Sequence, residues 1–254
     1  MFLRRSHVLA TDRSRYDHIL FPCLAALILV SVFVGFAQSY YLQSMLKLPP
    51  WKAFAAPPHP VLVHIHAVIF SSWILLLVAQ TSAVAGGRVE VHRRLGVAGF
   101  GLACLLVLVG LAVICEFLSR HHALEDPSLR FPFLQIIDLL VFSTLICFGY
   151  RQRFKPAAHK RLMLIGTIAL LGPAFSRWPV LIVNNSLVTD LCCYALLALL
   201  AGYDVWSIGE IHRATLWGST LLIVAHHPIL SILDRTVVWH RLAIYMQRLG
   251  SLLH

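Results

Sequence analysis

Residues 97–118 read VAGFGLACLLVLVGLAVICEFL, and Glu116 is the only charged residue among them. The hydrocarbon core of a bilayer is about 30 Å thick, so a helix needs roughly 20 mostly apolar residues to cross it. This stretch therefore predicts a membrane-spanning helix. Gly99 and Ala103 lie one helical turn apart within it, and small residues at this spacing favour close packing against a second helix.

Six other segments are apolar enough to cross a membrane, which predicts an all-α integral membrane bundle of seven transmembrane helices. The expected spans are 19–37, 61–80, 97–118, 134–150, 162–182, 188–208 and 215–233, in a single domain covering 1–254. The first span is long for a signal peptide and is expected to remain as an uncleaved anchor. Residues 234–254 mix apolar and cationic side chains, mainly between Val237 and Leu252, and predict an amphipathic helix at the membrane interface.

The composition supports this class and excludes others. Hydrophobic residues make up 59% of the chain and charged residues 13%, whereas a soluble domain carries about a quarter charged residues. These values exclude a secreted disulfide scaffold, a disordered protein and an ordinary cytosolic enzyme. The net charge of +10 lies between apolar runs and not along one face, so no nucleic-acid partner is expected. The six cysteines form no C-x-x-C motif, so neither a zinc site nor a thiol redox pair is indicated.

The distribution of cations between loops predicts the orientation. Cytoplasmic loops of membrane proteins are enriched in Lys and Arg. With the N-terminus inside, thirteen of the 21 cations fall on the inner side. They are Arg4, Arg5, Arg13, Arg15, Arg88, Arg93, Arg94, Arg151, Arg153, Lys155, Lys160, Arg161 and Arg213. We therefore expect the N-terminus inside, the C-terminus outside, and a location in a bacterial inner membrane.

Histidines are the most informative residues, because ten of the fourteen fall into two layers under this topology. The outer layer contains His59, His64, His66, His121, His122, His226 and His227, and the inner layer contains His92, His159 and His212. His66 and His226 are expected about 8 Å and 10 Å below the outer membrane surface. Two histidines at matched depth can hold one haem iron from both sides, so these residues predict an outer b-type haem.

Two histidines on each of the two helices could bind the outer haem, and the choice between them is left open. His64 and His66 point about 200° apart on a helix, so only one of them can face a given site. His66 shares a stripe with Trp73 and Gln80 and is the better inward candidate. His227 is the alternative to His226 on the last span. His66, His226 and His227 are also the candidate metal ligands, and the alternative for each is a buried histidine hydrogen-bonded to its neighbours.

The inner histidines each precede or adjoin cations at a helix entrance. His92 is followed by Arg93 and Arg94, and His159 by Lys160 and Arg161. These entrances suit an inner haem or metal site held by His92 and His159. They equally suit phospholipid head groups, because each Lys or Arg near an anionic surface contributes about 1 kcal/mol.

Charged residues inside the spans are expensive and therefore face the bundle and find partners. Asp138, Arg177 and Asp190 are expected in the outer half, with Glu116 at the outer end of its helix, and Asp204 shares a helix face with Asp190. One interpretation is an ion pair of Arg177 with Asp138 or Asp190 that fixes the packing. The other is that Arg177 binds an anionic group such as a haem propionate, while the carboxylates relay protons.

Several of these motifs resemble an uncharacterised group of small bacterial membrane proteins with a domain of unknown function. The resemblance covers about residues 60–220 and implies a fold and an inner-membrane location. Its motifs are His64-Ile65-His66, Trp73, Gln80, His92-Arg93-Arg94-Leu95-Gly96, His159-Lys160-Arg161-Leu162-Met163, Arg177, Asp190, Tyr203-Asp204, His212 and Thr215-Leu216-Trp217-Gly218. The general plan is also similar to cytochrome b561-type bundles, which carry their paired histidines inside the helices.

The leading functional hypothesis is a b-type-haem-binding membrane redox protein that transfers electrons, with a quinone or a respiratory complex as its partner. The alternatives are a non-enzymatic assembly factor or accessory subunit of a respiratory complex, and a proton-coupled carrier that uses Asp190, Asp204 and Arg177. No catalytic residue is assigned. A membrane oligomer is compatible with each hypothesis.

Overall fold

The structure is a computed structural model that describes residues 16–46, 60–120, 130–178, 186–226, 233 and 236–252. Within these ranges the chain is helical and forms no strand, which confirms the all-α class. The elements are α2 (Asp17–Phe36), the π-helix η2 (Ala37–Tyr41), α3 (Gln43–Leu46), α4 (Pro60–Ala85), α5 (Val89–Arg120), α6 (Arg130–Arg151), α7 (Pro156–Ile168), α8 (Gly172–Phe175), α9 (Ser186–Ile208), α10 (Arg213–His226) and α11 (Val237–Ser251).

Five helical segments are long and apolar enough to cross a membrane. They are Asp17–Tyr41, Val61–Ala85, Val89–Arg120, Phe131–Arg151 and Leu187–Ile208. The other two expected spans, 162–182 and 215–233, contain the shorter helices α7 and α10, of 13 and 14 residues. Both spans continue into residues outside the described ranges. The membrane-like character of the chain is thus confirmed, and the count of seven spans stays a prediction.

The expected span 162–182 is not one uninterrupted helix. Helix α7 ends at Ile168, and a turn leads into α8, which starts at Gly172. Pro173 explains the break, because proline has no N–H to donate and its ring clashes with the carbonyl four residues before it, here that of Ala169. The break places Arg177 on the turn after α8, where a continuous helix would have aimed its side chain elsewhere.

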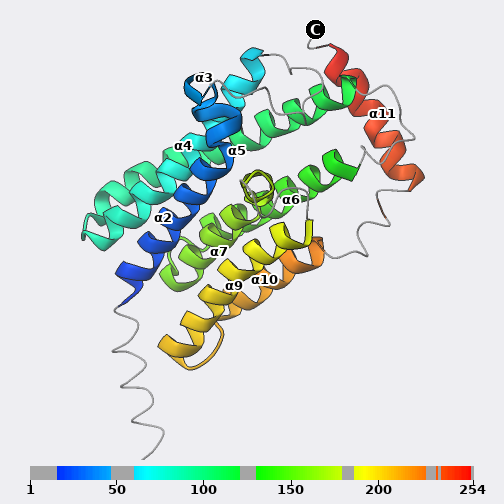
Figure 1. Ribbon diagram of the computed structural model, residues 1–254. Helices are drawn as coiled ribbons and strands as arrows, with labels where there is room; N and C mark the ends of the chain where they lie inside the picture. The colour runs from blue at the N-terminus through cyan, green and yellow to red at the C-terminus, as the bar shows by residue number, and fades with distance from the viewer. Residues whose placement is uncertain are drawn as a thin grey trace, which may run out of the picture.

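The helices lie next to one another in an order that differs from their order in the chain. Helix α4 packs against α2 and α5, α5 against α6, and α6 against α7, while α10 packs against both α7 and α9 (Figure 1). The turns 86–88, 152–155 and 209–212 all lie at the end of the bundle where α2 begins (Figure 1). We call this end the basic end, because its turns and helix starts carry Arg88, Arg93, Arg94, Arg151, Arg153, Lys155, Lys160, Arg161 and Arg213. The opposite end is called the far end.

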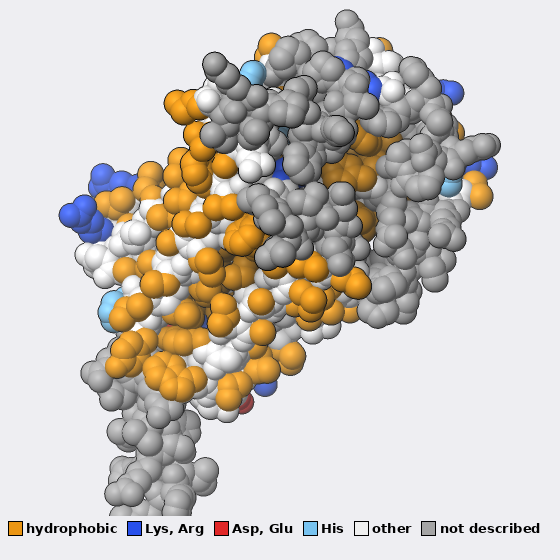
Figure 2. All heavy atoms as spheres, viewed as in Figure 1, with side chains coloured by type: hydrophobic (Ala, Val, Ile, Leu, Met, Phe, Trp, Pro, Cys, Tyr) orange, Lys and Arg blue, Asp and Glu red, His pale blue; other side chains and the backbone are white. Residues whose placement is uncertain are grey.

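Much of the described surface is apolar. Figure 2 shows hydrophobic side chains spread over the helices on one face, with cations at the margins. Val30, Val68 and Leu108 are more than half exposed, at 54%, 62% and 64%. Soluble monomers rarely expose contiguous apolar patches of more than a few hundred Å². A surface of this kind is what a lipid environment requires.

The C-terminal segment forms the expected amphipathic helix, α11. The Thr236 hydroxyl accepts a hydrogen bond from Trp239 N (3.3 Å), which caps the helix start. The buried side of α11 includes Trp239 and Gly250 and packs against α5. A Cβ at Gly250 would collide with the Cys115 carbonyl, so glycine allows the two backbones to approach closely. Its position at a membrane interface stays a prediction.

Candidate functional site

Two of the three expected inner histidines meet at the basic end. His92 lies in the first turn of α5 and His159 in the first turn of α7, and their ring centroids are 5.9 Å apart with an interplanar angle of 78°. Both rings are partly buried. The sequence places these residues at helix entrances 67 positions apart, and the packing of α5 and α7 around α6 brings them together.

The hydrogen-bond partners of the two rings fix their tautomers. His159 Nδ1 lies 2.9 Å from the Gly149 carbonyl, which can only accept, so the proton is on Nδ1 and Nε2 carries a lone pair. The Gln80 side chain contacts His92. With its NH2 group toward the ring, Gln80 donates to His92 Nδ1 (2.5 Å) and accepts from Gly96 N (3.0 Å). One ring thus offers an Nε2 acceptor and the other an Nε2–H donor.

The third inner histidine, His212, has a different position. It precedes α10, and its Nδ1 accepts a hydrogen bond from Ala214 N (3.0 Å), so it caps that helix. Burial lowers the pKa of His212 below its ordinary value, and Arg161 adds to the shift. Burial also lowers the pKa of His159, against the opposing effect of the Gly149 carbonyl. Both histidines are therefore held as neutral rings.

An ion pair that the sequence reasoning missed lies beside the histidine pair. Arg161 Nε is 3.0 Å from Asp204 Oδ1, and the two side chains are 3% and 0% exposed. Thr215 Oγ1 donates to the other carboxylate oxygen at 2.5 Å, and His212 N lies 3.2 Å from it. Asp204 is therefore a structural ion-pair partner that joins α7, α9 and α10. A buried carboxylate near a helix end signals a cation at the same depth, and Arg161 satisfies that condition.

A second ion pair continues the network toward α2. Lys160 pairs with Asp17, which also accepts a hydrogen bond from the Tyr203 hydroxyl at 3.0 Å. The Lys160 ammonium lies 4.7 Å from the centroid of the Phe21 ring. These contacts join the start of α2 to α7 and α9 at the basic end.

Toward the far end, His226 lies between two carboxylates. Its Nε2 is 2.7 Å from Asp138 Oδ1 on α6, and its Nδ1 is 3.5 Å from Asp190 Oδ1 on α9. The His226 and Asp138 side chains are 10% and 8% exposed, and that of Asp190 is 31% exposed. One expectation from the sequence was an ion pair of Arg177 with Asp138 or Asp190. In the structure both carboxylates instead contact the His226 ring.

The two histidines near the start of α4 diverge as expected. His64 is exposed, and its Nδ1 is 2.9 Å from the Tyr40 hydroxyl. His66 points inward and stacks on Phe70 with centroids 4.0 Å apart. Its Nδ1 is buried and has no hydrogen-bond partner in the described part of the chain. His66 therefore carries a buried polar atom that no described residue satisfies, which few buried polar groups of folded proteins do.

The remaining candidates have simpler positions. The Arg177 guanidinium donates to the Pro173 carbonyl at 2.6 Å and lies 5.0 Å from the centroid of the Phe36 ring. Glu116 is buried and pairs with Arg120 one turn along α5. His227 lies outside the described residues, as do His59, His121 and His122.

Neither metal geometry nor similarity identifies the site directly. The described residues contain no group of three or more His, Cys, Asp or Glu side chains that could hold a metal ion. Comparison with models of protein families, with curated proteins and with solved structures finds no match to this chain.

Proposed function

We propose that the protein is a membrane electron-transfer protein of the b-type haem class, in which His92 and His159 would hold the haem. The observation that carries the proposal is the 5.9 Å spacing of the two rings. Two imidazoles on opposite sides of one metal ion have centroids about 6 Å apart, because each ligating nitrogen lies about 2 Å from the metal.

The surroundings of the two rings fit this role. A ligating histidine usually donates its other N–H to a carbonyl or carboxylate, and His159 does so to Gly149. His92 reaches the same state if its proton moves to Nδ1 and the Gln80 amide turns its carbonyl toward the ring. Such a half turn also brings the Gln80 NH2 group toward Gly96 N and the amide oxygen toward the His92 carbonyl, so haem binding would require the Gln80 side chain to move away from these two groups.

Two histidines suit a haem better than a bare ion. Zinc sites normally take three or four protein ligands, whereas a haem brings its own equatorial nitrogens and needs only axial ligands. Arg93 follows His92 directly and interacts electrostatically with it, and a guanidinium group there can bind a propionate. The haem would supply one-electron oxidation and reduction, and the chain would hold it and set its potential.

The proposed haem lies at the basic end, whereas the sequence predicted an outer haem at the opposite end, on His66 and His226. His226 already contacts two carboxylates, which an iron would have to displace. The pairing of His66 with His226 stays a prediction. We further propose that the basic end faces the cytoplasm of a bacterial inner membrane, and that a membrane quinone or a respiratory complex exchanges electrons with the protein.

A reduced-minus-oxidised optical spectrum of detergent-purified, haem-replete protein tests the proposal. The native chain should show the sharp α-band of a b-type haem, and His92→Ala and His159→Ala should each abolish it. His64→Ala is the matched control, because His64 is exposed at the far end. Loss of the band in His66→Ala and His226→Ala, with retention in the two basic-end variants, would move the haem to the far end. A flat native spectrum would overturn the proposal.

The second candidate function is a proton-coupled carrier, and the Asp138–His226–Asp190 group favours it. A histidine between two carboxylates in an apolar bundle can take up and release a proton over a short distance. Proteoliposomes with an internal pH dye test this candidate under an imposed membrane potential. Proton entry should fall in Asp138→Asn and persist in Glu90→Gln, an exposed control in α5. Equal rates for native protein and empty liposomes would exclude it.

A further inference from the structure

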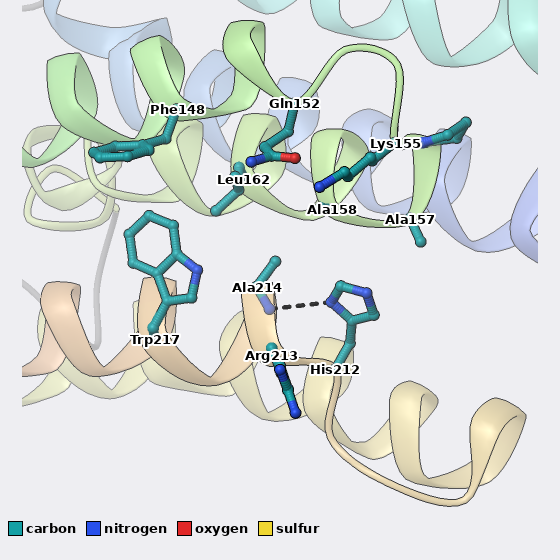
Figure 3. Close-up of a pocket in the computed structure, with 11 residues that line it drawn as sticks. Phe148, Gln152, Lys155, Ala157, Ala158, Leu162, His212, Arg213, Ala214 and Trp217 are labelled. Carbon is teal, nitrogen blue, oxygen red and sulfur yellow. Dashed lines mark hydrogen bonds between the residues drawn. The ribbon is translucent and has the colours of Figure 1, made fainter.

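A cavity of about 570 Å³ lies at the basic end between the α6–α7 turn and the start of α10 (Figure 3). It is separate from the His92–His159 pair, neither of whose residues lines it. Its wall contains two cations, Lys155 and Arg213, and no acidic side chain. The cavity is therefore electropositive, and its chemistry depends on how the polar and apolar walls are arranged.

The polar wall presents hydrogen-bond donors. Figure 3 shows the Lys155 amino group and the Gln152 amide on the α6–α7 side, facing the His212 ring across the cavity. His212 Nδ1 accepts from Ala214 N, so its proton lies on Nε2, which can donate. Arg213 borders the cavity, but its side chain turns away from α7 in this view, which makes Lys155 the first cation that a ligand would meet.

The apolar wall is aromatic. Phe148 and Trp217 contact each other edge to face, with centroids 5.6 Å apart, and together line one side of the cavity. Phe148 is 48% exposed and Trp217 38% exposed. Both residues lie on helices α6 and α10, one or two turns from the polar wall in the direction of the far end. The cavity thus passes from donors at the membrane surface to apolar rings within the membrane.

We propose that this cavity binds the phosphate head group of an anionic phospholipid, with Lys155, Gln152 and His212 on the phosphate and Phe148 and Trp217 along the acyl chains. The starts of α7 and α10 border the same wall and add the partial positive charge of two helix N-termini. A free phosphate ion would use the polar wall alone. The aromatic wall favours a lipid, because it offers apolar surface where the chains of a bound lipid would lie.

Thermal unfolding in detergent measures this binding. Native protein is titrated with phosphatidylglycerol, with phosphatidylcholine and with inorganic phosphate, and the concentration that gives half of the maximal stabilisation is compared. Lys155→Gln removes the first cation, and Arg153→Gln is the matched control, two residues away in the same turn and outside the cavity wall. Lys155 is exposed, so its replacement is not expected to prevent folding.

Phosphatidylglycerol should stabilise the native protein more than phosphatidylcholine, and Lys155→Gln should weaken the response about fivefold, the effect of one cation near an anionic lipid. Trp217→Leu, which keeps the wall apolar but removes the ring, should weaken it further. An equal loss in Arg153→Gln would show general surface charge and overturn the proposal. Protection by inorganic phosphate as strong as that by the lipid would overturn it in favour of a free-phosphate site.

Discussion

Arg161 and Asp204 join α7 to α9 through a bidentate contact, in which a terminal nitrogen of Arg161 donates to Asp204 Oδ1 at 2.5 Å and Nε donates to Asp204 Oδ2 at 3.2 Å. Neither side chain reaches the surface. Such a pair is costly to break from one side, because the remaining charge keeps its desolvation penalty without its partner. The pair is therefore a sensitive point for the stability of the basic end.

Asp204→Asn should destabilise the protein by about 3–5 kcal/mol, the usual result of removing one member of a buried ion pair. Chemical unfolding in detergent micelles, followed by circular dichroism, measures the change. Arg94→Gln is the control, because the Arg94–Glu90 pair is exposed and should contribute at most about 1 kcal/mol. If both variants unfold at the same denaturant concentration, the buried pair does not support the fold as described.

Gly250→Ala should loosen α11 from α5, because the added Cβ would collide with the Cys115 carbonyl. Overpacking of this kind costs about 1–3 kcal/mol. Gly202→Ala in α9 is the control, since a Cβ there meets no atom within 4 Å. The control should be neutral or stabilising, because alanine is the better helix former. Limited proteolysis of the C-terminal helix should accelerate only in Gly250→Ala.

The stability of the haem-free protein should decrease as the pH falls below about 6.5, the ordinary pKa of histidine. Burial lowers the pKa of His159 in the folded state, so the unfolded chain binds a proton more readily than the folded protein does. Acid therefore shifts the equilibrium toward the unfolded chain. His159→Gln should therefore reduce the loss of stability between about pH 7.5 and pH 5.5. A steeper slope in His159→Gln than in the native protein would contradict this effect of burial on His159.

Gln80 variants should alter the reduction potential if His92 and His159 hold a haem. Gln80→Glu offers only acceptors to His92 Nδ1–H, which strengthens the ring as a ligand and should lower the potential. Gln80→Leu removes the partner and should raise the potential or weaken haem retention by 10-fold to about 100-fold. Potentiometric titration of the α-band measures both effects. Identical potentials in all three proteins would show that Gln80 does not act through His92.

The sequence alone predicted the helical class, the positions of five apolar helices and the inward direction of His66. Each follows from local periodicity, which a single helix expresses by itself. The break near Pro173 was missed, although Gly172-Pro173 is a local signal for the end of a helix.

The partners of the buried charges were beyond a single sequence. The sequence gives the depth of a residue in the membrane, but not which helices are neighbours. Its depth in the membrane suggested Arg177 as the ion-pair partner of Asp138 or Asp190. Helix α10 instead packs against both α6 and α9, which brings His226 to the two carboxylates. Arg161 lay at the right depth for Asp204 and was not connected to it, because the contact of α7 with α9 is a property of the whole bundle.

Three consecutive residues at the start of α7 contact four other helices. His159 contacts α6 and the His92 ring of α5, Lys160 contacts Asp17 of α2, and Arg161 contacts Asp204 of α9. Successive side chains on a helix are about 100° apart, so these three point in different directions. Their contacts together fix the rotation of α7 about its own axis. A rotation of α7 that broke any one of these contacts would therefore disturb the other two, because a single helical turn carries all three residues.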